Sequence, residues 1–394
     1  GTPESISCSA NFGPDWYGPY MGFDHVEMML VGHNWFLPEK PPKGQHYERW
    51  YYADGRGDAR NMAYRGGPHS KTAAAQTWHS ELPSAWHNST WTADRAIDWL
   101  KNRSNTPFCA WVSFPDPHHP FDAPEPWSRL HNPAEVDLPP HRHRDLDHRP
   151  WWHKAALDTT PKGPKASVEI RENYSRIPPQ SDEQLREIIA NTYGQIALID
   201  HNVGRILIAL AEAGLDRNTY VFYISDHGDW LGDHGLVLKG PMPYEGLLRV
   251  PMIVRGPGIA AGQSCAEPVS TMDLASTFCQ LAGAEPGLTQ HGSSLVPFLQ
   301  GKSEERAFAM SEWELLPARI GVGLSLRTVR TKTHKLTVEL QTGDGEMYDL
   351  SRDPHEMENI FGHPAAAAMQ QELMDYIATR PDDAMPVMKA VGMA

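Results

Sequence analysis

The sequence predicts an α/β protein with a central mixed sheet flanked by helices, followed by a smaller α+β unit. A long helical pattern over 181–213 leads directly into the β-branched and aromatic run 219–224. Strands that alternate with helices are typical of a sheet covered on both faces. Later in the chain, closely spaced strand patterns over 324–349 are separated by polar turns, which is typical of an antiparallel sheet. We therefore expect domains at 1–305 and 306–394.

Capping residues mark the expected helices. Ser181 and Gln184 have the spacing of a capping box, and Gly214 is a good residue to follow a helix C-terminus. Thr92 is the expected N-cap of a helix that runs to about Lys101. The other expected helices cover 271–283 and 364–379.

The remaining segments are predicted as strands and loops. The apolar run 107–114 is expected to be a buried strand, and 249–258 another short strand. Residues 1–80 suggest loops and short elements on a surface. The stretch 115–180 contains 13 prolines and is expected to be a long loop. Within it, 141–148 ("HRHRDLDH") is interpreted as a solvated turn.

Composition limits the classes of partner. The chain has 394 residues and a net charge of −14, which argues against nucleic acid because phosphate binding normally needs a basic surface. No apolar run reaches the ~18 residues of a membrane span, so we expect no membrane partner. The first residues show no signal peptide, and both a cytoplasmic and a periplasmic location stay open. The four cysteines are too few for a disulfide framework, and a homo-oligomer is an open expectation.

Two candidate metal ligands stand at the end of the run 219–224. Asp226 and His227 follow it directly, and ligands in open α/β sheets collect beyond the carboxyl ends of strands. The carboxylate suits Ca²⁺ or Mg²⁺, while the imidazole leaves Mn²⁺ or Zn²⁺ open. The alternative is that Asp226 caps the next turn and His227 bonds only to nearby backbone.

Two further polar residues favour an anion site. Lys239 lies in a loop rich in glycine and proline, and an ammonium beside a metal suits a sulfate or phosphate. His118 follows the predicted strand 107–114 and is expected to contact the same anion or to protonate a leaving oxygen. The alternatives are an ordinary exposed lysine and a buried histidine whose hydrogen bonds are satisfied.

Several segments together resemble the sulfatase family of the alkaline phosphatase superfamily. They include "PHHPF", "YISDHGDWLGDHG", "LKGPMPYEGLLRVPMIV" and "EMYDLSRDPHEMEN", and the similarity covers most of the chain. The resemblance implies an alkaline-phosphatase-like fold. It also implies that Asp226 and His227 ligate a divalent metal, with Ca²⁺ favoured, and that Lys239 and His118 contact the sulfate. His234 is expected to line the same pocket as a catalytic residue.

One departure from the family pattern changes the expected activity. The family's nucleophile is a Cys or Ser in the context C/S-x-P/A-x-R, converted to formylglycine; the position four residues after Cys8 is Phe12. The resemblance therefore implies a sulfatase whose formylglycine segment is missing from this chain, and we expect the chain alone to be inactive. The substrate implied is a small-molecule sulfate ester, aryl or small alkyl. A phosphonate monoester or phosphodiester hydrolase and a non-catalytic anion- or metal-binding fragment are the alternatives.

Overall fold

The computed structural model describes two compact units of the chain. Unit 1 comprises Gly1–Leu138, Gln180–Asn218 and Met388–Ala394, and unit 2 comprises Pro139–Pro179 and Thr219–Val387. Within them the structure describes residues 15–29, 46–157, 177–285, 290–302, 304–315 and 322–382, with Gly13 and Gly287. The expected domain boundary near residue 305 stays a prediction.

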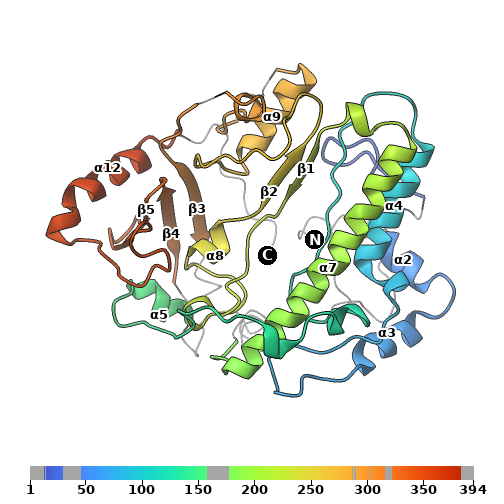
Figure 1. Ribbon diagram of the computed structural model, residues 1–394, viewed down its shortest axis with the longest axis horizontal. Helices are drawn as coiled ribbons and strands as arrows, with labels where there is room; N and C mark the ends of the chain where they lie inside the picture. Colours follow the sequence, from blue (N-terminus) through green and yellow to red (C-terminus); the bar gives the residue numbers. More distant parts are fainter. Residues whose placement is uncertain are drawn as a thin grey trace. The chain divides into compact units, whose positions relative to one another are not determined.

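The regular elements of unit 1 over the described residues are helices, with isolated β-bridges between loop segments. Its helices are α2 (His46–Tyr52), α3 (Gly57–Gly66), α4 (Asn88–Asn102) and α7 (Asp182–Glu212). Short 3₁₀ turns are η2 (Ser84–Trp86), η3 (Trp127–Arg129), η4 (Pro133–Glu135) and η6 (Asp216–Asn218). Helix α4 lies alongside the long helix α7 (Figure 1).

The ends of α7 follow the sequence prediction. The Ser181 hydroxyl accepts the Gln184 N–H at 3.3 Å, and the Gln184 side chain accepts the Ser181 N–H at 2.8 Å, so the capping box is confirmed. Gly214 has φ = +71° and follows the helix, as expected of a residue that adopts the left-handed conformation.

The start of α4 corrects the prediction. Thr92 is not an N-cap but lies inside the helix, which begins at Asn88. His87 takes the capping role because its ring nitrogen accepts the Ser89 N–H at 3.3 Å. Histidine is not among the preferred capping residues, so the sequence pattern favoured Thr92 instead.

An aromatic core lies in the first part of unit 1, where loops and short elements on a surface were expected. The rings of Tyr47 and Trp91 meet at a centroid distance of 5.3 Å, and those of Tyr64 and Trp78 at 5.6 Å. All four side chains are buried. The short helices α2 and α3 fit the expected short elements, but the expected surface position was wrong for residues 46–66, because their aromatic residues bury large areas without a regular period.

The segment 107–114 does not form the predicted buried strand. It has no strand structure, residues 109–113 are exposed, and the Trp111 side chain is 78% exposed. A β-strand is stabilised by hydrogen bonds to a neighbouring strand. Among the described residues no other strand pairs with this segment.

Unit 2 contains a strand pair that carries the candidate site. Strand β1 (Val221–Ile224) pairs antiparallel with β2 (Met252–Arg255), with Phe222 opposite Val254. Helix α9 (Asp273–Ala282) lies beside the pair (Figure 1). The rings of Phe222 and Phe278 are 4.9 Å apart. In the described part of the chain, β2 is the one strand that pairs with β1.

The second sheet of unit 2 is antiparallel, as predicted. Its order is β3–β4–β5–β6, formed by Ala309–Leu315, Leu324–Arg330, His334–Glu339 and Gly345–Asp349. Strand β3 was not predicted. Helix α12 (Ala367–Ala378), preceded by η8 (Pro364–Ala366), covers one face and places Leu373 and Ile377 against Val329 and Leu336.

Short helices complete unit 2. They are α5 (Trp151–Leu157), η7 (Asp233–Gly235), α8 (Glu245–Leu248) and α10 (Val296–Leu299). The expected loop 115–180 therefore contains η3, η4 and α5 in its described part, while 158–176 lie outside the described residues. Over the described stretches, no helix has both the length and the apolar character required to cross a bilayer.

Candidate functional site: a carboxylate, imidazole and ammonium cluster

The two predicted metal ligands lie together just beyond β1. The Asp226 carboxylate oxygen Oδ2 is 3.5 Å from the Nε2 atom of His227. The other carboxylate oxygen accepts the His227 N–H at 2.8 Å, which fixes the carboxylate against the backbone. The Asp226 side chain is 83% exposed and that of His227 37%, so the pair faces solvent.

The hydrogen bonds of His227 define which ring nitrogen carries the proton. Nδ1 lies 2.8 Å from the Gly228 carbonyl, which can only accept, so Nδ1 is the donor. Nε2 is then the lone-pair nitrogen. Lys239 Nζ donates to it at 2.9 Å. Three of the five predicted site residues, Asp226, His227 and Lys239, therefore form one cluster.

The donor atoms fit part of a divalent-metal site. Ligand atoms bound 2.0–2.6 Å from one ion are typically about 3–3.5 Å from each other, as Asp226 Oδ2 and His227 Nε2 are. Across the described residues no group of three or more His, Cys, Asp or Glu side chains has metal-binding geometry. The pair alone supplies two ligands, whereas Ca²⁺ takes 6–8.

Asp229 shapes the turn between the metal pair and Lys239. Its carboxylate accepts the backbone N–H groups of Leu231 at 2.9 Å and Leu238 at 2.8 Å. The Leu238 carbonyl in turn accepts the Trp230 N–H at 3.0 Å. Burial raises the pKa of Asp229 to about 7, against the opposing effect of these hydrogen bonds. Sequence reasoning missed this residue, although an aspartate two residues before a turn N–H is a recognisable signal.

His234 belongs to a different cluster of the same unit. Its ring stacks on Tyr244 with centroids 3.7 Å apart, and burial, followed by the positive charge of Arg149, lowers the pKa of His234 to about 2. His141 lies 5.3 Å from the His234 ring and pairs with Asp233 at 2.9 Å. His234 is thus a neutral imidazole, and its predicted catalytic role stays a prediction.

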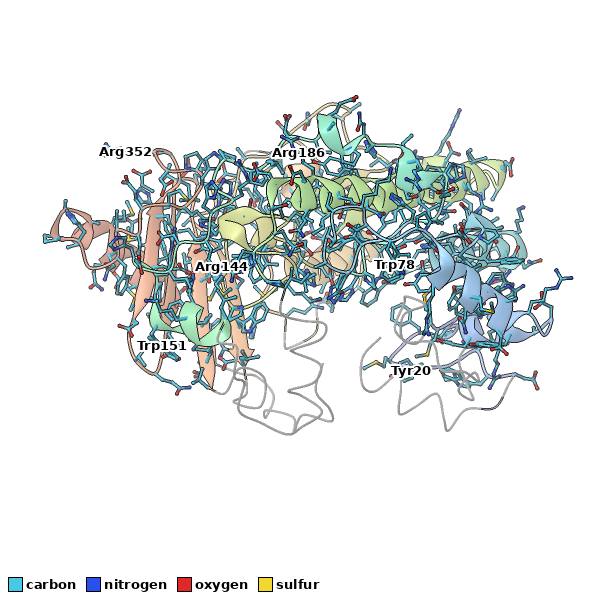
Figure 2. The ribbon with its side chains drawn as sticks, turned by 90° about the horizontal axis from the view of Figure 1, so that it is seen from below. Tyr20, Trp78, Arg144, Trp151, Arg186 and Arg352 are labelled. Atoms are coloured by element: carbon cyan, nitrogen blue, oxygen red, sulfur yellow. The ribbon has the colours of Figure 1, made fainter. Side chains whose placement is uncertain are left out.

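The stretch 141–148 is not simply the solvated turn expected from sequence. The His141 side chain is only 11% exposed, and its carbonyl accepts the His234 N–H at 2.9 Å. Arg144, labelled in Figure 2, donates to the Gly235 carbonyl at 3.1 Å. These contacts join residues far apart in sequence, so the local pattern could not reveal them.

His118 lies in unit 1, on a turn held by buried carboxylates. The Asp116 carboxylate accepts the Ser89 hydroxyl at 2.6 Å, and Asp122 accepts the Gln195 amide at 3.1 Å. The same amide donates to the Pro120 carbonyl at 3.0 Å. His118 itself is half-buried and its Nδ1 lies 2.7 Å from the His119 carbonyl. Its predicted contact with the anion stays a prediction.

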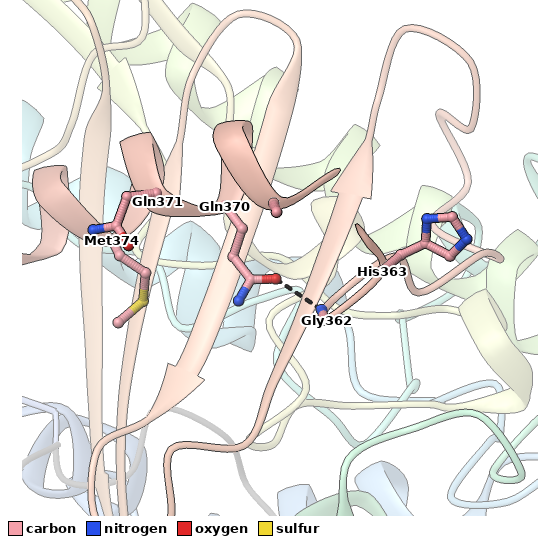
Figure 3. Close-up of a pocket in the computed structure, with 6 residues that line it drawn as sticks. Gly362, His363, Gln370, Gln371 and Met374 are labelled. Carbon is pink, nitrogen blue, oxygen red and sulfur yellow. Dashed lines mark hydrogen bonds between the residues drawn. The ribbon is translucent and has the colours of Figure 1, made fainter. Parts of the chain in front are cut away.

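Helix α12 and the segment before it line a separate pocket of about 330 Å³ in unit 2, shown in Figure 3. Its lining residues are Gly362, His363, Ala367, Gln370, Gln371 and Met374. Gln370 accepts the Gly362 N–H at 2.7 Å across it. The pocket contains none of the predicted site residues.

Known proteins share long stretches of this sequence. Relatives include the uncharacterized sulfatase YidJ of Escherichia coli K12, 26% identical over 375 residues that cover 91% of this chain and 68% of that protein. An arylsulfatase of Clostridium perfringens is 29% identical over 296 residues, which cover 74% of this chain and 56% of that protein. The chain thus spans roughly half to two thirds of the length of these two relatives.

Solved structures confirm the predicted fold class. A phosphonate monoester hydrolase of Agrobacterium radiobacter superimposes with a TM-score of 0.70 at 26% identity, covering 87% of this chain and 69% of that chain. A protein in complex with its substrate D-glucosamine-2-N,6-O-disulfate superimposes with a TM-score of 0.60 at 26% identity, covering 74% and 68%.

Two family models match the chain. The model for the C-terminal region of N-sulphoglucosamine sulphohydrolase matches residues 232–382. The sulfatase model matches residues 26–284, a range that includes the Asp226–His227 pair and Lys239. Because that match covers more than half of the sequence, the chain belongs to the sulfatase family.

Proposed function

We propose that this chain carries the metal- and sulfate-binding part of an enzyme that hydrolyses small-molecule sulfate esters. The observation that carries the proposal is the convergence of three groups at one point. Asp226 Oδ2 lies 3.5 Å and Lys239 Nζ 2.9 Å from the same lone-pair nitrogen of His227. A carboxylate, a neutral imidazole and an ammonium together suit a metal ion bound to an anion with several oxygens.

Each residue has a role in this proposal. Asp226 and His227 would hold the divalent ion, with Ca²⁺ favoured, and the ion would supply Lewis acidity toward the sulfate oxygens. Because Nε2 of His227 has one lone pair, the ion would take the place of the Lys239 hydrogen bond and leave the ammonium for the anion. Lys239 would pair with a charged oxygen of the ester. His118 would hold or deliver a proton at the leaving oxygen. His234 is suited to a neutral hydrogen bond rather than to proton donation, because the pKa of His234 is about 2.

Electrostatics indicates how much Lys239 can contribute. Two unit charges about 4 Å apart attract by roughly 4 kcal/mol at an effective dielectric of ~20, about a thousandfold in rate when confined to the transition state. Lys239 is exposed here, and exposed ion pairs contribute ~0–1 kcal/mol. The bound substrate must therefore exclude water from the site for the Lys239 ion pair to approach the larger of these two energies.

The nucleophile would be the family's formylglycine, and this sequence contains no Cys or Ser in its motif. We therefore expect the 394-residue chain to turn over neither p-nitrophenyl sulfate nor the matched phosphonate ester. A second candidate function, phosphonate monoester hydrolysis, is favoured by the TM-score of 0.70 with the Agrobacterium hydrolase. This reaction would use the same site residues to bind a phosphonate in place of a sulfate.

Binding measurements test the proposal without turnover. Isothermal calorimetry should detect Ca²⁺ binding to the wild-type chain. Asp226→Asn should weaken this binding by roughly tenfold or more, because even the loss of a residue that hydrogen-bonds to a metal ligand lowers metal affinity by about 10–100-fold. Sulfate titrated into the calcium-loaded chain should bind more weakly in Lys239→Met. Asp344→Asn and Lys302→Met, at exposed positions, serve as matched controls.

Three outcomes separate the candidates. Sulfate binding that exceeds methylphosphonate binding supports the sulfatase function, and the reverse preference supports the phosphonate hydrolase. Equal Ca²⁺ affinity in wild type and Asp226→Asn would mean that the cluster is not a metal site.

A further inference from the structure

We propose that Trp152, Trp230 and Lys335 form a clamp that positions Lys239 for anion binding. The three residues come from α5, from the segment after β1 and from β5. Each donates a hydrogen bond to a different one of three consecutive carbonyls that follow Lys239. The inference rests on the proposed function, since it assigns positioning residues to the anion-binding lysine.

The contacts of the clamp occur in sequence order. Trp152 Nε1 donates to the Pro241 carbonyl at 3.0 Å, and Trp230 Nε1 donates to the Met242 carbonyl at 3.1 Å. Lys335 Nζ donates to the Pro243 carbonyl at 2.6 Å. All three donor side chains are buried, with exposed fractions of 4% or less.

The segment 241–244 needs these donors. All four of its residues are buried, and a buried carbonyl without a partner costs about 1–3 kcal/mol. The Met242 carbonyl also accepts the Tyr244 N–H at 2.8 Å, so the Trp230 indole is its second donor. Pro241 and Pro243 have no N–H and fix their own φ, so the segment cannot continue a helix or a strand ladder. Side-chain donors from outside therefore replace regular secondary structure.

The clamp also extends to the residue next to the lysine. A Cβ on Gly240 would lie 2.7 Å from the Trp230 ring, so only glycine fits beside the indole in this arrangement. On the other side of the lysine, the Leu238 N–H and carbonyl are bonded to Asp229 and to the Trp230 N–H. The backbone is thus held on both sides of Lys239 while its side chain is exposed.

Holding the backbone matters because the lysine side chain is flexible. An ammonium on a four-carbon stem can reach many positions, and its binding strength depends on how often it occupies the productive one. A fixed backbone limits the volume that Nζ samples around His227 Nε2, from which it is 2.9 Å away. Removing one clamp hydrogen bond should therefore weaken anion binding without changing any atom that touches the anion.

Tryptophan-to-phenylalanine substitutions test the clamp. Trp152→Phe and Trp230→Phe each keep an aromatic ring and remove one N–H donor. The matched control is Trp151→Phe, because Trp151 (labelled in Figure 2) is the neighbour of Trp152 on α5 and donates to Thr342 at 3.3 Å instead. The measurement is the sulfate affinity of the calcium-loaded chain by calorimetry, with the thermal midpoint recorded for every variant.

The expected result is a coupling to Lys239. Each of Trp152→Phe and Trp230→Phe should weaken sulfate binding by about three- to tenfold, the net value of one hydrogen bond, whereas Trp151→Phe should leave it unchanged. In a Lys239→Met background the same substitutions should have no further effect on sulfate affinity. A purely structural role would lower the thermal midpoint in either background without this dependence.

Two results overturn the clamp in distinguishable ways. If Lys239→Met weakens sulfate binding but Trp152→Phe and Trp230→Phe keep the wild-type affinity, the proposed function stands and the clamp does not. If Lys239→Met binds sulfate as wild type does, the anion-binding role of the lysine fails and the clamp fails with it.

Discussion

Two proline-rich segments, 115–120 in unit 1 and 239–244 in unit 2, present their polar groups by different means. In unit 1 His118 lies between two buried carboxylates, Asp116 and Asp122, which accept hydrogen bonds from neighbouring side chains. In unit 2 Lys239 precedes a buried segment whose carbonyls accept hydrogen bonds from indole and ammonium groups. The first arrangement depends on acceptors that can titrate.

The difference predicts unequal sensitivity to pH and to mutation. Burial raises the pKa of Asp122 well above its usual range, and the nearby charge of Asp116 raises it further. An indole N–H does not titrate in this pH range, so its hydrogen bonds do not depend on pH. The unit 1 turn should therefore respond to pH, whereas the clamp of unit 2 should respond mainly to loss of its buried cation.

Lys335→Met is expected to have the largest effect. Lys335 pairs with Glu356, whose side chain is 3% exposed, and Glu356 also accepts the N–H of Glu245 at the start of α8. Removing the ammonium leaves Glu356 as a buried, unpaired charge, which typically costs about 3–5 kcal/mol. Urea unfolding of the variant should show this loss in the free energy of unfolding.

Lys332→Met is the matched control for that substitution. Lys332 lies just before the same strand and pairs with Glu267 at the surface, with its side chain 49% exposed. It should change stability far less. Equal losses in the free energy of unfolding would show that the buried Lys335–Glu356 pair contributes no more stability than a surface ion pair.

His234→Asn should reduce the acid sensitivity of unit 2. The pKa of His234 is about 2 in the folded protein and about 6.5 when unfolded, so only the unfolded state takes up this proton as the pH falls below 6.5. Stability then falls by up to about 1.4 kcal/mol per pH unit in that window. Asparagine tolerates the φ of +53° at this position.

The measurement is the free energy of unfolding between pH 6.5 and pH 5. Its slope should be smaller by about one proton in His234→Asn than in wild type, while the exposed-site control His148→Asn should keep the wild-type slope. An unchanged slope in His234→Asn would mean that His234 is already charged in the folded protein.

Asp122→Asn should give an effect of opposite sign. Because the folded pKa of Asp122 is raised, the folded state keeps a proton that the unfolded state loses above about pH 4. Stability contributed by this proton therefore falls as the pH rises through that range. Asparagine cannot titrate, so the decline should diminish. Unfolding curves from pH 4 to 7, with the exposed Asp137→Asn as control, measure it.

The sequence predicted those features that depend on nearby residues. The capping box of α7, the glycine after its C-terminus and the antiparallel sheet over 324–349 all follow from spacing within a few residues. Asp226, His227 and Lys239 could be predicted together because they lie within one turn-rich segment. The resemblance to sulfatases was likewise readable from short motifs in a fixed order.

Only the tertiary structure decided the features that join distant residues. The contact of His141 with Asp233 and the donors of the Lys239 clamp depend on partners up to about a hundred residues away, and the apolar segment 107–114 is exposed although its composition favoured burial. Hydrogen-bond satisfaction and burial are properties of the packed chain, so a local pattern cannot specify them. The sequence by itself indicated the candidate site residues; the packed chain decided how firmly each is held.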